Sequence, residues 1–262
     1  MNLTCYFLFT CFSFLFAAQV INLPTIQNVN LEEFPYQAQI VTSEETACSA
    51  IIISRNYIMT PATCIAESSS VKVYVGTKTK AKHLSKNILN TYGYNSSNFL
   101  FNGDDNTFWN FKYDIALIRI PQPLEFSAVI QKAKIKWDDV LLKENSMLQV
   151  SGWSNSDATF DLKKMEVKLA PEILCDYCYN AGETQKIISC FKQPGSNYLD
   201  YFGNIVELNG NVLGYLIPGS NGGICSKLVP FLNIANFAHW VETQTGIRTN
   251  TYDIDIKLNN IV

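Results

Sequence analysis

Three absences narrow the range of functions for this chain. There is no basic excess, because 20 Lys and Arg face 23 Asp and Glu for a formal net charge of -3, which argues against a nucleic-acid partner. Beyond the N-terminus, no stretch offers the roughly 20 apolar residues that a membrane span needs. Histidine occurs only as His83 and His239, so few side chains can exchange protons near neutral pH.

The N-terminus differs from the rest of the chain. Residues 1–16 are almost continuously apolar and end in Phe16-Ala17-Ala18, a small-residue site for cleavage before Gln19. This pattern predicts a signal peptide over 1–18 and a secreted, extracellular mature chain over 19–262. The alternative is an uncleaved N-terminal anchor.

The cysteine count agrees with secretion. Removing 1–18 takes away Cys5 and Cys11, and an even number remains: Cys48, Cys64, Cys175, Cys178, Cys190 and Cys225. Six cysteines in a secreted chain predict three disulfides, which can be drawn in fifteen ways. Cys175-x-x-Cys178 could also indicate zinc, but no second such pair or His pair accompanies it, so we expect no metal and no cofactor.

One glycosylation sequon lies in the predicted mature chain, at Asn95-Ser96-Ser97. Such a sequon predicts a glycoprotein with Asn95 in a surface loop.

Short strands separated by turns dominate the remaining sequence. Branched residues predict strands over 50–53, 71–75, 114–120 and 147–150. An Asn209-Gly210 turn between 205–208 and 211–216 predicts a hairpin, and helical patterns cover 170–180 and 234–245. Without repeats or a linker, we expect one all-β domain, a sandwich or barrel pair, with a C-terminal helix.

Several blocks resemble the chymotrypsin/trypsin family of serine proteases, in the order and at about the spacing of that family. They are Phe34 to Gln37, Cys48 to Cys64, Tyr113 to Leu117, Val150 to Trp153, and Phe231 to Val241. The resemblance implies two six-stranded antiparallel β-barrels, a C-terminal α-helix and a cleft between the barrels.

The family's acyl-transfer chemistry needs a hydroxyl nucleophile, an imidazole base and a carboxylate that orients the imidazole. The imidazole should stand immediately before Cys64, where this chain has Thr63, which cannot accept a proton near neutral pH. The carboxylate is present as Asp114. Without an imidazole we expect Asp114 to cap nearby backbone amides.

The nucleophile position is also altered. Counting back from the Asn209-Gly210 turn places Phe202 there, and Ser196 is the only Ser, Thr or Cys between Phe191 and Gly219. The segment from Gly219 to Gly223 contains Ser220. If Ser220 were the nucleophile, two strands would have to fit between it and the C-terminal helix, and too few residues are present for them. We therefore interpret the segment as a turn.

Other family features are changed at matching positions. Asp200 replaces the glycine of the oxyanion hole, where a carboxylate would repel a developing negative charge. Tyr201 replaces the aspartate that pairs with a new N-terminus on activation, and no Lys or Arg precedes Arg55 to allow a trypsin-like cut. Ser196 or a neighbour falls at the base of the specificity pocket.

The resemblance also implies disulfide pairings. Cys48–Cys64 matches the family's bridge around the histidine loop, and Cys178–Cys190 its helix-to-strand bridge. The usual partner of Cys225, near Tyr198, is absent, which leaves Cys175–Cys225 as the third hypothetical pair.

Two segments are candidates for binding. Lys78, Lys80 and Lys82 alternate along the sequence, and on a strand they would share one face that attracts an anion, or protects a sheet edge. The aromatic segment 92–109 would form a loop at the rim of the cleft, packed on itself or anchoring a partner.

Together these features predict a secreted pseudoprotease without catalytic activity, which acts by binding or regulating an extracellular protein such as a protease, an inhibitor or a receptor. One alternative is an active serine endopeptidase, which family membership alone would imply. The other is a glycan- or surface-binding protein that uses the lysine strand.

Overall fold

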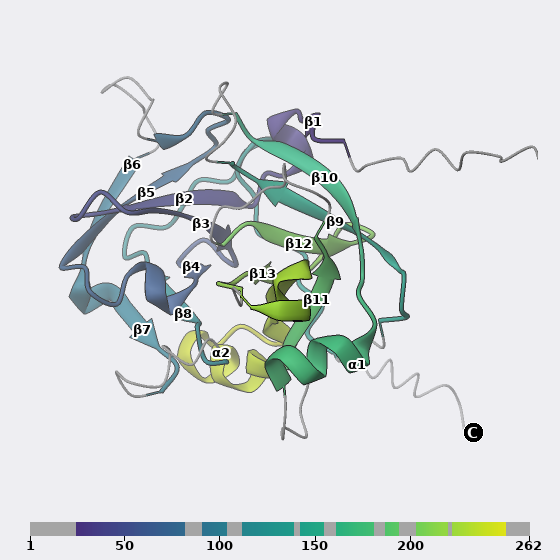
Figure 1. Ribbon diagram of the computed structural model, residues 1–262. Coiled ribbons are helices and arrows are strands. Elements are labelled where there is room, and N and C mark those ends of the chain that lie inside the picture. Colours follow the sequence, from purple (N-terminus) through teal and green to yellow (C-terminus); the bar gives the residue numbers. More distant parts are fainter. Residues whose placement is uncertain are drawn as a thin grey trace, which may run out of the picture.

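The computed structural model describes residues 25–81, 91–103, 112–138, 142–154, 161–180, 187–193, 203–219 and 222–249. These residues form two antiparallel sheets of seven strands each, with a short C-terminal helix. Figure 1 shows the strands of one sheet on one side, those of the other sheet opposite, and α2 below them. The signal peptide predicted for 1–18 lies outside the described residues.

The first sheet closes on itself through a broken strand. Its order is β6-β5-β2-β3-β4-β8-β7, in which β6 pairs with β5 and β7 pairs with β8. One helical turn, η4 (Ser96–Asn98), separates β6 from β7 along the chain, so the two are halves of one barrel strand. The strands are β2 (Gln37–Thr42), β3 (Ala47–Ile52), β4 (Tyr57–Thr60), β5 (Ser70–Val75), β6 (Thr91–Asn95), β7 (Phe99–Phe101) and β8 (Ala116–Arg119).

The second sheet has the order β1-β10-β9-β12-β13-β14-β11. A bridge between Leu169 and Phe191 joins β10 to β11, and the very short β1 lies on the outer side of β10. Apart from β1, six strands make the barrel, so the prediction of two six-stranded barrels is confirmed. The strands are β1 (Gln27–Asn28), β9 (Met147–Gly152), β10 (Lys163–Lys168), β11 (Ile188–Lys192), β12 (Ile205–Leu208), β13 (Asn211–Leu216) and β14 (Leu228–Asn233).

The sequence pattern explains why these segments are strands. In β5, Val71, Val73 and Val75 are buried while the residues between them are not, the period of two expected for one buried face. The predicted hairpin is β12–β13, and its turn residues Asn209 and Gly210 both have positive φ, 51° and 76°. This conformation is the reason for the Asn-Gly preference.

Both predicted helices are present. The segment 234–245 forms η8 (Ile234–Phe237) and α2 (Ala238–Thr245), which ends at Gly246 in the left-handed conformation. The segment 170–180 forms α1 (Glu172–Cys175), followed by a π-turn, η6 (Asp176–Asn180). Within the described ranges, no helix has the length and apolar character to cross a membrane.

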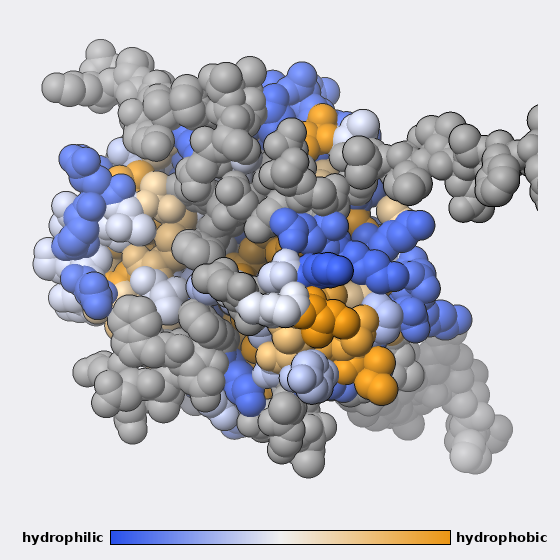
Figure 2. Space-filling view, viewed as in Figure 1, coloured by the Kyte–Doolittle hydropathy of each residue, from blue (hydrophilic) through white to orange (hydrophobic). Residues whose placement is uncertain are grey.

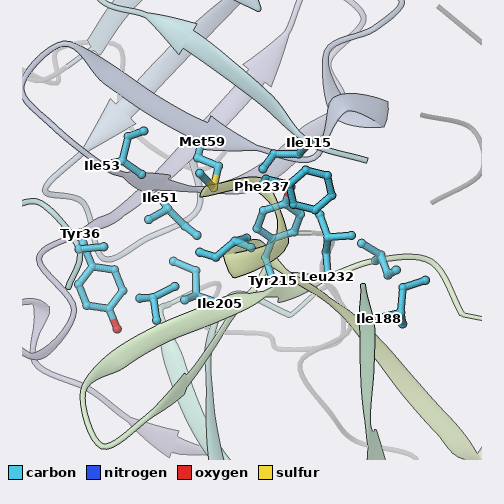
Figure 3. Close-up of a cluster of buried hydrophobic side chains, with 14 of the residues drawn as sticks. Tyr36, Ile51, Ile53, Met59, Ile115, Ile188, Ile205, Tyr215, Leu232 and Phe237 are labelled. Atoms are coloured by element: carbon cyan, nitrogen blue, oxygen red, sulfur yellow. The ribbon is translucent and has the colours of Figure 1, made fainter. Parts of the chain in front are cut away.

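An apolar cluster joins the two barrels into one folding unit (Figure 3). The first barrel supplies Ile51 and Met59, the second supplies Ile205 and Leu232, and Phe237 comes from the C-terminal segment. All five are buried. Each buried side chain of this size contributes about 1.5–3 kcal/mol, so separating the barrels would expose a large apolar surface.

One buried amide completes this interface. Asn204 Oδ1 accepts hydrogen bonds from Ser49 Oγ at 2.7 Å and from the Trp153 N–H at 3.1 Å, and its Nδ2 donates to the Trp153 carbonyl at 2.7 Å. Gly152 makes room for this amide, because a Cβ there would lie 1.9 Å from Asn204 Oδ1. Gly203 likewise has a positive φ of 79°, and a Cβ on it would meet the Ser49 carbonyl at 2.3 Å.

The disulfides correct two of the implied pairings. Cys48–Cys64 is confirmed, but the other bridges are Cys175–Cys190 and Cys178–Cys225, not Cys178–Cys190 and Cys175–Cys225. The cause is the direction of the helical segment. Cys175 ends α1 buried against β11, with Sγ 3.7 Å from the Ile188 carbonyl, whereas the half-buried Cys178 lies one turn further on, beside the turn that holds Cys225.

Replacing Asn204 with alanine tests the contribution of the amide to stability. The change leaves a buried hydroxyl and both backbone groups of Trp153 without partners, so we expect a loss of about 3 kcal/mol in the free energy of unfolding, measured with urea. Asn236→Ala is the control, because exposed Asn236 lies outside the interface; it should cost less than about 0.5 kcal/mol. Equal losses for the two variants would contradict this role of Asn204.

Candidate functional site

Thr63 and Asp114 contact each other directly, as the resemblance implies for residues at these positions. Thr63 lies in the turn η2 (Ala62–Cys64), which the Cys48–Cys64 disulfide ties to β3. Asp114 precedes β8 and is fully buried. The Thr63 backbone N–H donates to Asp114 Oδ1 at 2.7 Å, and Thr63 Oγ1 donates to Asp114 Oδ2 at 3.0 Å. The expectation that Asp114 caps nearby backbone amides is confirmed.

Burial controls the ionisation of this carboxyl. Removal from water raises the pKa of Asp114 from its ordinary value of 3.8 to about 6, against the opposing effect of the hydrogen bonds from Thr63 and from the Ala62 backbone. The hydrogen bonds therefore compensate only part of the cost of burying the charge, and a substantial fraction of Asp114 is protonated in mildly acidic solution.

Tyr215 joins the site from the other barrel. It lies on β13, is fully buried, and donates its hydroxyl proton to the Asp114 backbone carbonyl at 2.7 Å. Burial, with the nearby Asp114 charge, raises its pKa well above the ordinary value of 10, so Tyr215 stays neutral. Sequence reasoning missed this residue, because no motif marks it within the hairpin. It holds the Asp114 segment against the second barrel.

The remaining catalytic candidates are not brought to this pair within the described part of the chain. His239 lies exposed on α2. Several positions that the sequence singled out lie outside the described residues: His83, Ser196, Asp200, Tyr201, Phe202 and Ser220.

No metal centre is formed by the described residues, which contain no group of three or more His, Cys, Asp or Glu placed around a common point. Cys175 and Cys178 are each bonded to a different cysteine. Their sulfurs are therefore occupied, and the motif that could have indicated zinc is part of two disulfides.

The lysine segment is not the expected strand face. Strand β5 ends at Val75, and Gly76 follows with φ 63°, so the alternation along the sequence does not continue as a strand. Lys80 is only 1% exposed, and Lys78 forms a salt bridge with Asp161, with 3.9 Å between Nζ and Oδ2. The prediction that these two lysines share an exposed face is wrong, and Lys82 lies outside the described residues.

The aromatic segment also differs from the expected rim loop. Its first part forms β6 and β7 at the closing strand of the barrel, and Phe99 is buried there. Asn95, at the end of β6, is exposed, and its Oδ1 accepts hydrogen bonds from both Ser97 N–H and Ser97 Oγ. The sequon thus lies in an accessible turn.

Asp114→Asn tests the cost of the buried charge. Asparagine can keep the two contacts with Thr63, since its oxygen can accept from the Thr63 N–H and its amide can donate to Thr63 Oγ1. The folded chain holds the proton of Asp114 more tightly than the unfolded chain, because the pKa is raised from 3.8 to about 6. The stability that comes from this protonation is fully present below pH 3.8, and it is lost as the pH rises through about 6. From about pH 4 to about pH 7, the variant should therefore gain stability over the wild type, by up to about 3 kcal/mol, in urea unfolding.

Asp138→Asn is the control for this pH series. A hydrogen bond from Lys136 lowers the pKa of exposed Asp138, so its removal should give no gain with rising pH, and any trend should have the opposite sign. A constant difference between Asp114→Asn and the wild type across the pH range would show that Asp114 is not desolvated.

Comparisons with known proteins agree with this architecture. The sequence model of the Trypsin family matches residues 25–241. Brachyurin of Leptuca pugilator is 26% identical over 223 residues, 82% of this chain and 94% of its own length. Collagenase of Hypoderma lineatum is 27% identical over 233 residues, 82% of this chain and 84% of its own length.

Among solved structures, the scabies mite inactivated protease paralogue S-I1 has a TM-score of 0.69 at 16% identity, and the alignment covers 83% of this chain and 97% of the paralogue. This likeness supports the fold alone. The match to the family model extends over most of the chain and over both barrels. The chain therefore belongs to the trypsin family.

Proposed function

We propose that this chain is a secreted, non-catalytic member of the trypsin family that acts by binding an extracellular protein, such as a protease, an inhibitor or a receptor. The observation that carries the proposal is the pair formed by Thr63 and Asp114. The resemblance to the family assigns Thr63 to the position of the imidazole, and Thr63 donates a hydrogen bond to each oxygen of the Asp114 carboxylate.

Without the base, no group would activate the nucleophile of the reaction. A serine hydroxyl is too weakly acidic to attack a peptide carbonyl unaided near pH 7, so a neighbouring group must accept its proton. The hydroxyl of Thr63 donates to Asp114 and has no basic lone pair comparable to that of imidazole. His239 is exposed on α2, and no hydrogen bond joins it to Thr63 or Asp114.

The sequence supports the proposal at the nucleophile position. Phe202 replaces the serine, and Ser196 is the only hydroxyl or thiol side chain between Phe191 and Gly219. Asp200 and Tyr201 replace the oxyanion glycine and the activation aspartate. These changes affect separate requirements of one mechanism, so a shift of one residue in the alignment would not restore it.

Secretion and glycosylation belong to the same proposal. The apolar segment 1–18 directs the chain out of the cell, three disulfides suit an oxidising environment, and Asn95 carries a glycan in its exposed turn. The disulfides and the shared apolar cluster keep a rigid scaffold, which a binding protein requires even when catalysis is lost.

An active peptidase is the competing function. It is favoured by the names of the relatives, which include a collagenase and a transmembrane serine protease, but the scabies mite proteins of the same fold are described as inactivated, and fold does not imply function. The glycan-binding alternative is weaker, because Lys80 is buried and Lys78 lies near Asp161.

A fluorophosphonate probe separates binding protein from peptidase, because it reacts only with an activated serine. We expect no labelling of the secreted full chain, before or after limited trypsin treatment, under conditions that label active chymotrypsin. Thr63→His should also remain unlabelled, since the serine is missing as well. Labelling that disappears on substitution of one serine of this chain would overturn the proposal.

A further inference from the structure

A buried acidic side chain lies at the interface between the two barrels. Glu207 on β12 is only 5% exposed. Tyr36, which directly precedes β2 in the first barrel, donates its hydroxyl proton to Glu207 Oε2. Figure 3 shows the Tyr36 ring at the edge of the apolar cluster, with its hydroxyl pointing away from the cluster. The hydrogen bond therefore crosses from one barrel to the other at the edge of their apolar contact.

Polar side chains from the two barrels alternate along this part of the interface. Gln37 on β2 donates through Nε2 to Ser151 Oγ on β9 at 2.8 Å. Burial and the charge of Glu207 raise the pKa of Tyr36 well above its ordinary value of 10, and a hydrogen bond from Ser151 offsets this rise only in part. Tyr36 therefore keeps its proton near neutral pH, and Glu207 is the group at this interface that can change its charge.

The charged groups around Glu207 do not form an ion pair with it. Among the described residues, the salt bridges involve other carboxylates. Lys164 on β10 attracts Glu207 only from a distance, because its ammonium is paired with exposed Glu33. Exposed Glu166 lies in the same cross-strand row, since both Glu207 and Glu166 pair with Gln149. Figure 2 shows hydrophilic surface where Figure 1 places β10, so these outer charges face water.

Burial makes the charge of Glu207 costly. It raises the pKa of Glu207 above the ordinary value of 4.5, although the hydrogen bond from Tyr36 and the charge of Lys164 lower it in part. In the unfolded chain the carboxyl group is hydrated and has its ordinary pKa. The stability that comes from protonation of Glu207 is therefore fully present below pH 4.5, and it is lost as the pH rises through the folded pKa.

We propose that the interface between the barrels is a pH-sensitive clamp in which Glu207, held across the interface by Tyr36, takes up a proton when the barrels close on each other. The clamp is tightest in mildly acidic fluid. It weakens toward neutral and alkaline pH, because the buried carboxylate then carries a charge that no ion pair compensates. This inference concerns the interface itself and does not depend on the proposed binding function.

The opposite ionisation sets the acid limit of the clamp. A hydrogen bond from Lys164 lowers the pKa of exposed Glu33, so the contribution of this pair is lost only as the pH falls below the ordinary value of 4.5. Asp114, the buried carboxyl group beside Thr63, changes in the same direction as Glu207. The experiment must therefore separate Glu207 from Asp114.

Glu207→Gln tests the clamp, because glutamine keeps an oxygen that can accept the Tyr36 hydroxyl proton but cannot ionise. Unfolding of the full chain in urea reports on the interface, since the apolar cluster joins both barrels in one folding unit. Between pH 4.5 and pH 8, the urea midpoint of the wild type should fall relative to that of the variant. A difference that stays constant with pH, or that turns against the variant as the pH rises, would overturn the proposal.

Glu166→Gln is the matched control, because it removes an exposed carboxylate from the same cross-strand row. It should show no gain over the wild type that grows with pH. A gain equal to that of Glu207→Gln would assign the effect to net charge and would contradict the clamp.

A double-mutant cycle tests whether the effect crosses the interface. Tyr36→Phe removes the hydrogen bond that favours the ionised form of Glu207, so it should cost more stability at pH 8 than at pH 4.5. In the Glu207→Gln background, the loss caused by Tyr36→Phe should be the same at both pH values. A hydroxyl with a merely structural role would give a loss that is independent of pH in both backgrounds, and this result would reject the proposal.

The same pH series in the Asp114→Asn background separates the two buried acids. The gain from Glu207→Gln should persist there, because Asp114 is hydrogen-bonded to Thr63 and not to Glu207. If the gain disappears, the pH dependence belongs to Asp114 alone and Glu207 is not the clamp. Since no step of the experiment involves catalysis or a partner, its outcome is independent of labelling by fluorophosphonate.

Discussion

The contact between the two barrels is the constraint on which the site depends. Apolar side chains from both halves of the chain meet there, and two polar anchors fix their relative position: the Asn204 amide, bonded to Ser49 and Trp153, and the Tyr215 hydroxyl, bonded to the Asp114 carbonyl. Thr63 and Asp114 come from the first barrel, and Tyr215 from the second. A shift of one barrel against the other would break these hydrogen bonds and leave buried polar groups unpaired, which is costly.

The structure keeps the parts of the trypsin family that build a scaffold. The aspartate of the family pattern remains buried, but here its oxygens are satisfied by a backbone amide and a threonine hydroxyl. A buried carboxylate with these partners acts as a cap that fixes the turn η2 near the disulfide of Cys64. This role explains how Asp114 remains useful where no histidine of the described residues hydrogen-bonds to it, although burial raises its pKa.

Much of the fold followed from local sequence. Alternating valines in β5, the Asn-Gly turn of β12–β13 and the helical pattern after Asn233 all predicted what the structure contains, because each is a short-range preference of the backbone. The family resemblance, not local sequence, assigned Thr63 and Asp114 to the same site, and the contact between them agrees with that assignment.

The errors arose where geometry depends on longer-range contacts. Cys175 and Cys178 lie three residues apart, and only the orientation of α1 on β11 decides which of them faces Cys190. Lys80 alternates with its neighbours as on a strand, but the left-handed turn at Gly76 ends the regular pattern. Tyr215 has no sequence signal, because its importance comes from a carbonyl that is distant along the chain.

The apolar cluster between the barrels has a consequence for how the polypeptide matures. Ile51 and Met59 belong to the part that is synthesised first, while their contacts Leu232 and Phe237 are added near the end. During synthesis, the apolar side chains that the first barrel contributes to this interface remain exposed to water until the second barrel has been made. One barrel produced alone would therefore tend to aggregate. Cleavage of the chain between the barrels would leave two fragments that stay associated through the apolar cluster.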